Sequence, residues 1–117
     1  MKMEHSADID KWLKVSRADG VGPVIFTRLL KRFGSVDRIM GASVSELTRV
    51  EGIGNKTAEK IAGSIHKFSP EKELAHADKL GVTVIHAEDE RYPAALRVTP
   101  EKPMVLYVQG EKQKRDS

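Results

Sequence analysis

A repeat with an offset of 32 residues places the strongest constraint on how this chain can fold. The segment Gly20-Val21-Gly22 recurs as Gly52-Ile53-Gly54, with one apolar residue between two glycines in each copy. The same offset aligns further apolar residues, pairing Val15 with Leu47, Ala18 with Val50, Phe26 with Ala58, Leu29 with Ile61 and Leu30 with Ala62. Internal repeats of this length indicate one supersecondary unit used more than once. We therefore expect two similar units.

Each copy carries apolar residues at helical spacing on both sides of its glycine pair. In the first copy these are Trp12, Leu13 and Val15, then Ile25, Phe26, Leu29, Leu30 and Phe33. In the second copy they are Val44, Leu47 and Val50, then Ala58, Ile61, Ala62 and Ile65. The pattern predicts a helix, a tight turn and a second helix in each copy, with the aromatic residues in the core.

The two glycines of each pair are expected to have different roles. The first can end a helix in the left-handed conformation that other residues resist. Val21 or Ile53, between the glycines, is expected to point inward and fix the hairpin to the core. The second glycine leaves the backbone bare where another backbone could approach. Pro23 suits the first turn of a helix, where its missing N–H costs nothing.

A further helix over residues 36–42 is predicted to link the copies. Gly34 and Ser35 form its stop and cap signals, and Ser43 is expected to cap the next helix. Glu46 completes a Ser-x-x-Glu capping box with Ser43.

The start of each second helix is a candidate phosphate site. Unpaired backbone N–H groups and the positive end of the helix dipole favour an anion there. Lys56 lies at this point only in the second copy, so we expect the second hairpin to bind phosphate better. The candidate DNA-binding residues are Gly20, Val21, Gly22, Arg28 and Lys31 in the first copy, and Gly52, Ile53, Gly54, Asn55, Lys56 and Thr57 in the second.

The positive charge is concentrated in the same part of the chain. Residues 1–69 hold 12 Lys and Arg against 8 Asp and Glu, whereas residues 70–117 hold 8 against 9. This mild excess favours a polyanionic partner for the first part. Backbone contacts position a protein without reading sequence, so non-specific and strongly salt-dependent DNA binding is expected.

The second part of the chain has an α/β pattern. Ser69 is expected to cap a helix over residues 71–80 that Gly81 ends, and β-branched runs predict strands at 82–85 and 104–108. The order helix, strand, crossover, strand is typical of the start of an α/β sheet, and uncovered strand edges invite self-association. We expect a helical domain over 1–69, an incomplete α/β domain over 70–110 and a polar tail over 111–117.

The sequence lacks the residue patterns of several other kinds of site. The chain contains no cysteine, and its four histidines show no metal-ligand spacing. Asp89 and Glu90 are adjacent and are expected to form a solvated turn rather than a catalytic carboxylate pair. No nucleotide-binding glycine loop follows a strand, and no apolar run could span a bilayer. We expect a cytoplasmic protein that is not an enzyme and needs neither a metal nor another cofactor.

The order of these motifs resembles the N-terminal part of the bacterial DNA processing protein A (DprA/Smf) family. The resemblance rests on residues spread over the chain up to Gly110, among them Gly20-Val21-Gly22-Pro23, Phe33-Gly34-Ser35, Gly52-Ile53-Gly54, Gly81-Val82, Tyr92-Pro93, Leu106-Tyr107-Val108 and Gly110. It implies a mainly α fold, in which a tandem helix-hairpin-helix (SAM-like) domain precedes the start of a Rossmann-like domain.

The resemblance also implies a function in DNA processing. Family members bind single-stranded DNA and help to load the recombinase RecA during natural transformation, so DNA and RecA are the expected partners. The family's main single-strand site lies beyond the matching residues and does not carry over. The leading hypothesis is a non-catalytic, sequence-non-specific DNA-binding module. One alternative is a protein-interaction or self-association module. The other is an enzyme, since this hairpin also occurs in glycosylases, ligases and nucleases.

Overall fold

The computed structural model describes residues 4–109, and the predicted polar tail and Gly110 lie outside this range. No helix among the described residues is long and apolar enough to cross a membrane. The elements follow in the order α1 (Ile9–Ser16), α2 (Pro23–Phe33), α3 (Val36–Met40), α4 (Val44–Leu47), α5 (Asn55–Ser64), α6 (Glu71–Leu80), β1 (Thr83–His86), α7 (Ala94–Arg97) and β2 (Val105–Val108).

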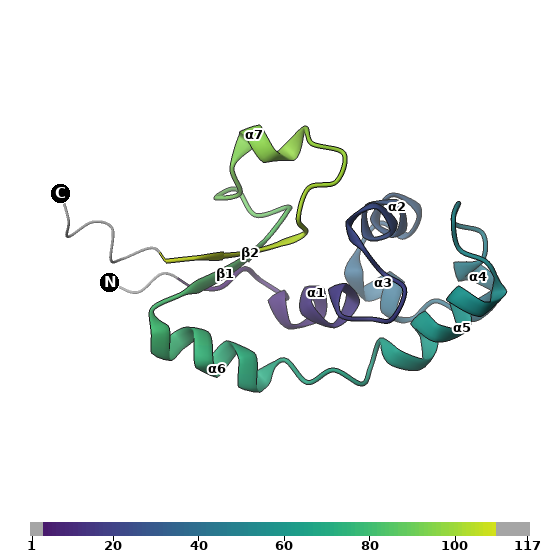
Figure 1. The fold of residues 1–117 in the computed structure, drawn as a ribbon, viewed down its shortest axis with the longest axis horizontal. Helices are drawn as coiled ribbons and strands as arrows, with labels where there is room; N and C mark the ends of the chain where they lie inside the picture. The colour runs from purple at the N-terminus through teal and green to yellow at the C-terminus, as the bar shows by residue number, and fades with distance from the viewer. Residues whose placement is uncertain (1–3, 110–117) are drawn as a thin grey trace.

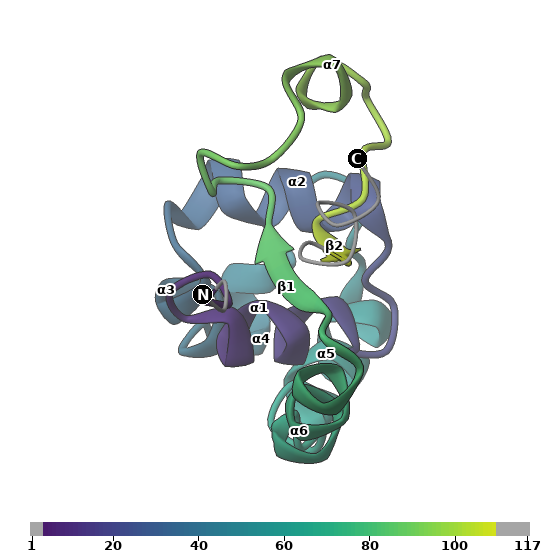
Figure 2. The same ribbon diagram turned by 90° about the vertical axis from the view of Figure 1, so that its left-hand side faces the viewer.

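The molecule is elongated, with principal extents of 51 × 30 × 17 Å. Helices α1 to α5 gather at one end, and the two strands lie toward the other (Figure 1). Helix α6 and the segment 87–104, which contains α7 and is called the α7 loop below, lie on opposite sides of the strands (Figures 1 and 2). The mainly helical fold that the sequence predicts, with a small α/β part after it, is confirmed.

The backbone hydrogen bonds of the two hairpins repeat with the sequence offset. The Val21 N–H donates to the Ala18 carbonyl at 3.1 Å, and the Ile53 N–H donates to the Val50 carbonyl at 3.1 Å. At the start of the second helices, the bonds from Phe26 to Gly22 and from Ala58 to Gly54 both measure 2.9 Å. Two tandem helix-hairpin-helix units are therefore present.

The first glycine of each pair adopts the left-handed conformation that was predicted, but it does not end a helix. Gly20 has φ +91° and Gly52 has φ +94°. Helix α1 ends at Ser16 and α4 at Leu47, so each glycine lies further along, inside the turn. The prediction was wrong in this detail because a short hydrogen-bonded turn separates the end of each helix from its glycine. In these turns the Ala18 N–H donates to the Val15 carbonyl, and the Val50 N–H donates to the Leu47 carbonyl.

The two hairpins complete each other. A Cβ atom on Gly20 would lie 3.1 Å from the Thr57 methyl carbon in α5, and one on Gly52 would lie 3.2 Å from the terminal carbon of Ile25 in α2. Thr57 and Ile25 are themselves equivalent under the 32-residue offset. The first glycine of each hairpin therefore faces the second helix of the other, as an approximate two-fold relation requires.

Helix ends in the linking region follow the predicted caps. Gly34 ends α2 at φ +89°, and the Ser35 side chain accepts from the Arg38 N–H at the start of α3. Ser43 and Glu46 form the complete capping box of α4, and the bond from the Ser43 N–H lowers the pKa of Glu46. Helix α3 ends at Met40, two residues before the predicted end.

Ser69 does not cap α6. The N-cap position is Pro70, no side chain caps the helix, and the Ser69 hydroxyl donates instead to the Glu71 carboxylate at 2.9 Å. Pro70 is buried and α-helical at φ −79°, so the N-cap position lies one residue beyond Ser69, whereas the helix itself spans residues 71–80 as predicted. Gly81 ends α6 in the left-handed conformation, as predicted.

The strands pair antiparallel, with Val84 opposite Tyr107 and Ile85 opposite Leu106. The α7 loop is therefore a return connection, and the crossover expected from the sequence is wrong, because a crossover would make the strands parallel. The start of a Rossmann-like domain stays a prediction, since two strands do not define that fold.

The N-terminal segment covers the other edge of β1. The Ser6 N–H donates to the Val84 carbonyl at 3.0 Å, and the Ser6 hydroxyl accepts from the His86 N–H at 3.0 Å. Of the two strand edges expected to be uncovered, that of β1 is thus occupied, whereas no strand of the described residues pairs with the outer edge of β2. Self-association through that edge stays a prediction.

The helical and α/β parts share one apolar core. Trp12 in α1 stacks on Phe26 at 5.2 Å and on His86 at 4.2 Å between ring centroids. Met104 and Val84 belong to the same buried cluster as Trp12. The two parts are thus packed together, and the division of the chain at residue 69 stays a prediction.

Candidate nucleic-acid interface

The start of α5 forms an open turn on the surface of the second hairpin. Gly52, Gly54, Asn55 and Lys56 are exposed, whereas Ile53 between the glycines is buried and fixes the turn to the core, as predicted. Gly54 is extended, and a Cβ atom there would meet nothing within 4 Å. The turn therefore leaves space for a second backbone to approach Gly54.

The first turn of α5 offers unpaired donors beside this space. The N–H groups of Asn55, Lys56 and Thr57 precede the first intrahelical bond, which Ala58 makes to Gly54. They add to the positive end of the helix dipole, next to the Lys56 ammonium group. The Thr57 side chain is half-buried, and its methyl group faces Gly20.

Cations from the first copy lie next to this second turn. The Arg28 guanidinium donates through Nη1 to the Glu51 carbonyl at 2.9 Å and covers Gly52. A shallow cavity of about 260 Å³ beside it is lined by Arg28, Lys31, Arg32, Arg49, Val50 and Glu51. The structure therefore brings two predicted residues of the first hairpin, Arg28 and Lys31, to the second.

Arg49 was not among the predicted site residues. It lies three residues before Gly52 and joins the cations of α2 only because the two hairpins pack against each other. A basic residue three positions before the glycine pair was the sequence signal that could have identified it.

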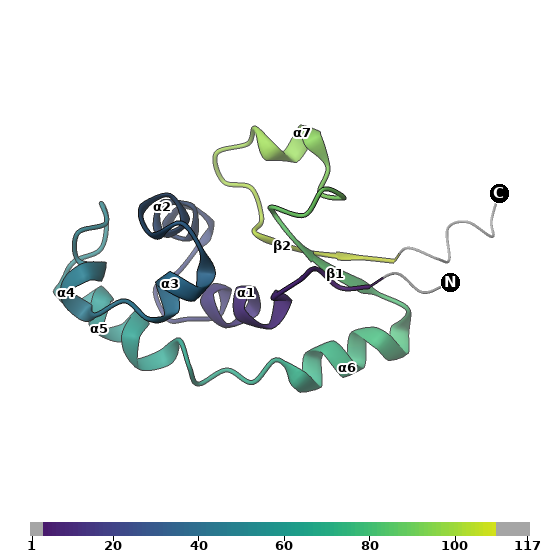
Figure 3. The same cartoon turned by 180° about the vertical axis from the view of Figure 1, so that it is seen from behind.

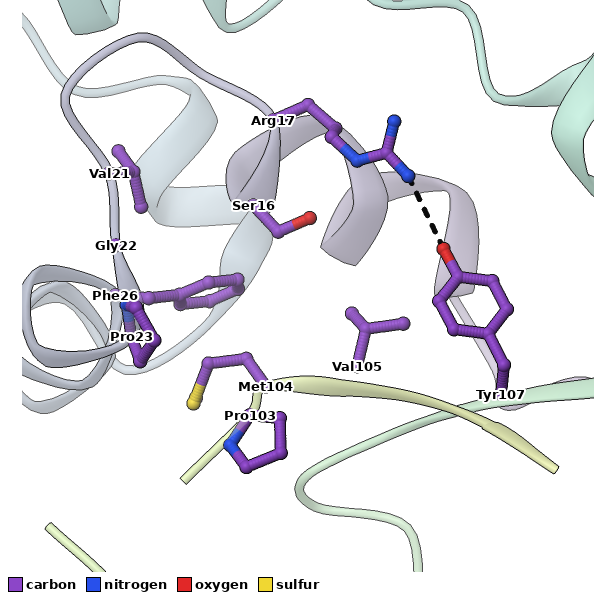
Figure 4. A pocket seen from close by; sticks show the side chains of 10 residues that line it. All are labelled: Ser16, Arg17, Val21, Gly22, Pro23, Phe26, Pro103, Met104, Val105 and Tyr107. Carbon is purple, nitrogen blue, oxygen red and sulfur yellow. Dashed lines mark hydrogen bonds between the residues drawn. The ribbon is translucent and has the colours of Figure 1, made fainter. Parts of the chain in front are cut away.

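The first hairpin offers a poorer phosphate site. Pro23 removes one N–H from the start of α2, and Asp19 is exposed nearby in the turn. Val21 is only half-buried, unlike the buried Ile53, because it lines a cavity of about 270 Å³ between the hairpin and β2. Figure 4 shows Val21, Gly22 and Pro23 on one side of this cavity, with Met104 and Val105 on the other.

Arg17, at the rim of this cavity, is held by other parts of the chain. Its Nη2 donates to both Glu73 carboxylate oxygens at 2.8 Å and to the Tyr107 hydroxyl at 3.4 Å, as Figure 4 shows for Tyr107. The guanidinium also lies 4.7 Å from the centre of the Phe68 ring. Burial, followed by the bond to Glu73, raises the pKa of Tyr107. Arg17 therefore fastens α1 to α6 and β2.

The turn expected at Asp89 is present, but the Asp89 carboxylate is not solvated, which corrects the expectation for that residue. Its carboxylate accepts from the Ser6 hydroxyl at 2.5 Å and from three nitrogens of Arg91 at 2.8–3.0 Å. The Arg91 bonds hold the pKa of Asp89 well below its usual range. Glu90 is exposed, as expected. The carboxylate thus organises the α7 loop, and among residues 4–109 no group of three His, Asp or Glu side chains could hold a metal ion.

Comparison with known proteins identifies the repeat. Residues 13–67 match the family model described as a SAM-like helix-hairpin-helix tandem. The chain is 34% identical over 106 residues to the protein Smf of Synechocystis sp., an alignment that covers 91% of this chain and 27% of that protein. The chain thus spans about a quarter of the length of this relative.

Shorter similarities link the chain to two further kinds of protein. It is 57% identical over 42 residues to the UvrABC system protein C of Haloarcula marismortui, covering 36% of this chain and 7% of that protein. It is 32% identical over 79 residues to the DNA ligase of Chlamydia caviae, covering 68% of this chain and 12% of the ligase.

Proposed function

Because this chain belongs to the Smf (DprA) family and contains a SAM-like helix-hairpin-helix tandem, we propose that it is a non-catalytic, sequence-non-specific DNA-binding module. Its place is in DNA processing and recombination. Handling of single-stranded DNA and loading of the recombinase RecA are the finer roles that the family resemblance suggests.

The observation that carries this proposal is the composition of the second hairpin surface. Three unpaired N–H groups at the start of α5 lie beside an open glycine, and α2 adds its cations at the same turn. Phosphate oxygens fit such a surface, because N–H donors, a helix dipole and mobile cations all favour negative charge. None of these groups recognises a base edge, so binding is expected to be independent of sequence.

The direct test replaces Lys56 by Glu. We expect Lys56→Glu to weaken DNA binding uniformly across sequences and to reduce the slope of log affinity against log salt by about one unit. Fluorescence anisotropy of labelled single-stranded and duplex oligonucleotides, at several salt concentrations, measures both quantities.

The matched control is Lys79→Glu, which makes the same charge change on α6, at the far end of the molecule (Figure 3). Equal affinity of Lys56→Glu and the unaltered chain would contradict the hairpin assignment. Absence of binding even at low salt would favour the alternative of a protein-interaction module. Sedimentation, alone and with candidate partner proteins, would then be the informative measurement.

A further inference from the structure

A second cationic cavity lies between α2 and the α7 loop. It has a volume of about 330 Å³, with Thr27, Leu30 and Lys31 on the α2 side and Glu88, Arg97 and Lys102 on the loop side. The two walls of this cavity are far apart in the sequence, because the second hairpin, α6 and β1 lie between α2 and the loop. We call this space the α2 cleft.

The cations of the α2 cleft are not neutralised by carboxylates. Among residues 4–109, the lysine and arginine ion pairs join Lys11 to Asp8 and Asp37, Arg17 to Glu73 and Arg91 to Asp89. Within the same range, neither Lys31 nor Lys102 lies within 4.0 Å of a carboxylate oxygen. Glu88 is the single acidic residue of the lining. The cleft therefore carries unbalanced positive charge over an apolar floor.

Arg97 is held in place without losing its charge. Its Nη2 donates to the backbone carbonyl of Asp89 at 2.5 Å, and its guanidinium carbon lies 5.7 Å from the centre of the Tyr92 ring. Neither partner is an anion. The Asp89 backbone is itself fixed, because the Asp89 side chain is bonded to Ser6 and Arg91. Arg97 is thus a pre-positioned cation on the wall of the cleft.

Lys31 connects this cleft to the second hairpin. It lines both the α2 cleft and the cavity beside Gly52 that Arg28, Arg32 and Arg49 also line. Together the two cavities present six cations, namely Arg28, Lys31, Arg32, Arg49, Arg97 and Lys102, against the two acids Glu51 and Glu88. A continuous cationic strip therefore runs from the turn of the second hairpin across α2 to the α7 loop.

We propose that the α2 cleft is a second phosphate-binding surface, which contacts the backbone of DNA that extends beyond the second hairpin. This inference rests on the proposed function, and it adds a role for the α7 loop that the hairpins do not require. The occupant is a phosphodiester chain, because the six cations form a strip across α2 rather than a single enclosed anion pocket.

The test compares Lys102→Glu with the unaltered chain on a short duplex of about 10 base pairs, one helical turn, and on a duplex about three times longer. We expect Lys102→Glu to weaken binding of the long duplex and to reduce its salt slope by about one unit, with the short duplex unaffected. Lys102→Gln, which removes the charge without reversing it, should give a smaller loss in the same direction.

The controls separate this inference from the proposed function. Lys79→Glu on α6 should leave both duplexes unaffected, and thermal melting establishes that Lys102→Glu is folded. If affinity for the long duplex falls with Lys56→Glu but not with Lys102→Glu, the proposal for the α2 cleft is overturned and the hairpin assignment stands. Loss with Lys102→Glu but none with Lys56→Glu overturns the hairpin and supports the cleft. If Lys102→Glu lowers the affinity for the short and the long duplex equally, the cleft is not a separate binding surface. If the unaltered chain binds neither duplex, both proposals are overturned.

Discussion

The two glycines of the second hairpin serve the fold and the surface separately. Gly52 has φ +94°, and a Cβ atom there would lie 2.7 Å from the Arg28 Nη1 atom. Gly54 has φ −90°, which any residue adopts, and a Cβ atom there would point into open space. The first position therefore needs glycine for conformation, whereas the second leaves room for a ligand.

These differences predict that a Gly→Ala substitution lowers stability at the first position and DNA binding at the second. Gly52→Ala should lower the free energy of unfolding by about 1–2 kcal/mol, the cost of a left-handed residue with a side chain, and should displace Arg28 from the Glu51 carbonyl. Gly54→Ala should change stability by less than about 0.5 kcal/mol but weaken DNA binding, because its methyl group occupies the approach to the α5 start. Urea unfolding and anisotropy titrations measure the two effects. A Gly54→Ala protein that is as destabilised as Gly52→Ala would contradict this division of roles.

At the scale of elements, the α7 loop is anchored near its two ends by buried side chains, among them Tyr92 and Met104, and by polar bonds. The four residues of α7 include none that is buried, and Val98 is 84% exposed. Tyr92 is buried and donates its hydroxyl to the Pro103 carbonyl at 2.7 Å, which joins the two ends of the loop. Asp89 then fixes the loop to the N-terminal segment through Ser6.

Removal of the Asp89 carboxylate should therefore loosen this loop selectively. We expect Asp89→Ala to lower the free energy of unfolding by roughly 1.5–3 kcal/mol, the range for hydrogen bonds to charged groups. Amide hydrogen exchange should accelerate in the α7 loop before it does so in α2 or α5. Glu90→Ala is the matched control, because Glu90 is exposed and adjacent, and it should change stability by less than about 0.5 kcal/mol. Equal effects of the two substitutions would argue against the role assigned to Asp89.

At the scale of the whole molecule, Trp12 connects the helical tandem to the strands. Its ring is stacked between Phe26 of α2 and His86 of β1. The Nδ1 atom of His86 accepts from the Glu88 N–H at 3.1 Å, a bond that requires this nitrogen to be unprotonated. Burial lowers the pKa of His86 below its usual 6.5. Protonation of His86 thus opposes the packing of the two parts.

The sign of the resulting pH effect follows from the lowered pKa. The unfolded chain binds a proton at His86 at higher pH than the folded chain does, so the unfolded state holds more protons in the window just below 6.5. Stability from this group is complete above that window and is lost as the pH falls through it. Denaturant unfolding at about pH 8 and about pH 5.5 should show this loss, and His86→Gln should reduce it. His76→Gln, at an exposed position, should retain the full pH dependence.

Much of the helical tandem could be predicted from the sequence, because its information is local. The glycine pairs, the capping box at Ser43 and the apolar periodicity each act within a few residues. The antiparallel pairing of β1 with β2 could not be predicted in this way, since no short hairpin turn joins the two strands and fixes their relative direction. The position of Arg49 beside α2, and that of Lys102 across from Lys31, depend on packing between distant segments. The sequence therefore predicted the hairpin turn, Arg28 and Lys31, but not the positions of Arg49 and Lys102.

The reciprocal contacts of Gly20 with Thr57 and of Gly52 with Ile25 have a consequence for how the tandem unfolds. Each turn is completed by a helix that belongs to the other copy, so neither copy retains its neighbours once the other has opened. An intermediate with one intact hairpin would expose the buried face of α2 or α5 to water. The two copies, although they are separate in the sequence, therefore form a single cooperative unit. The second helix of each copy provides the surface against which the turn of the other copy packs.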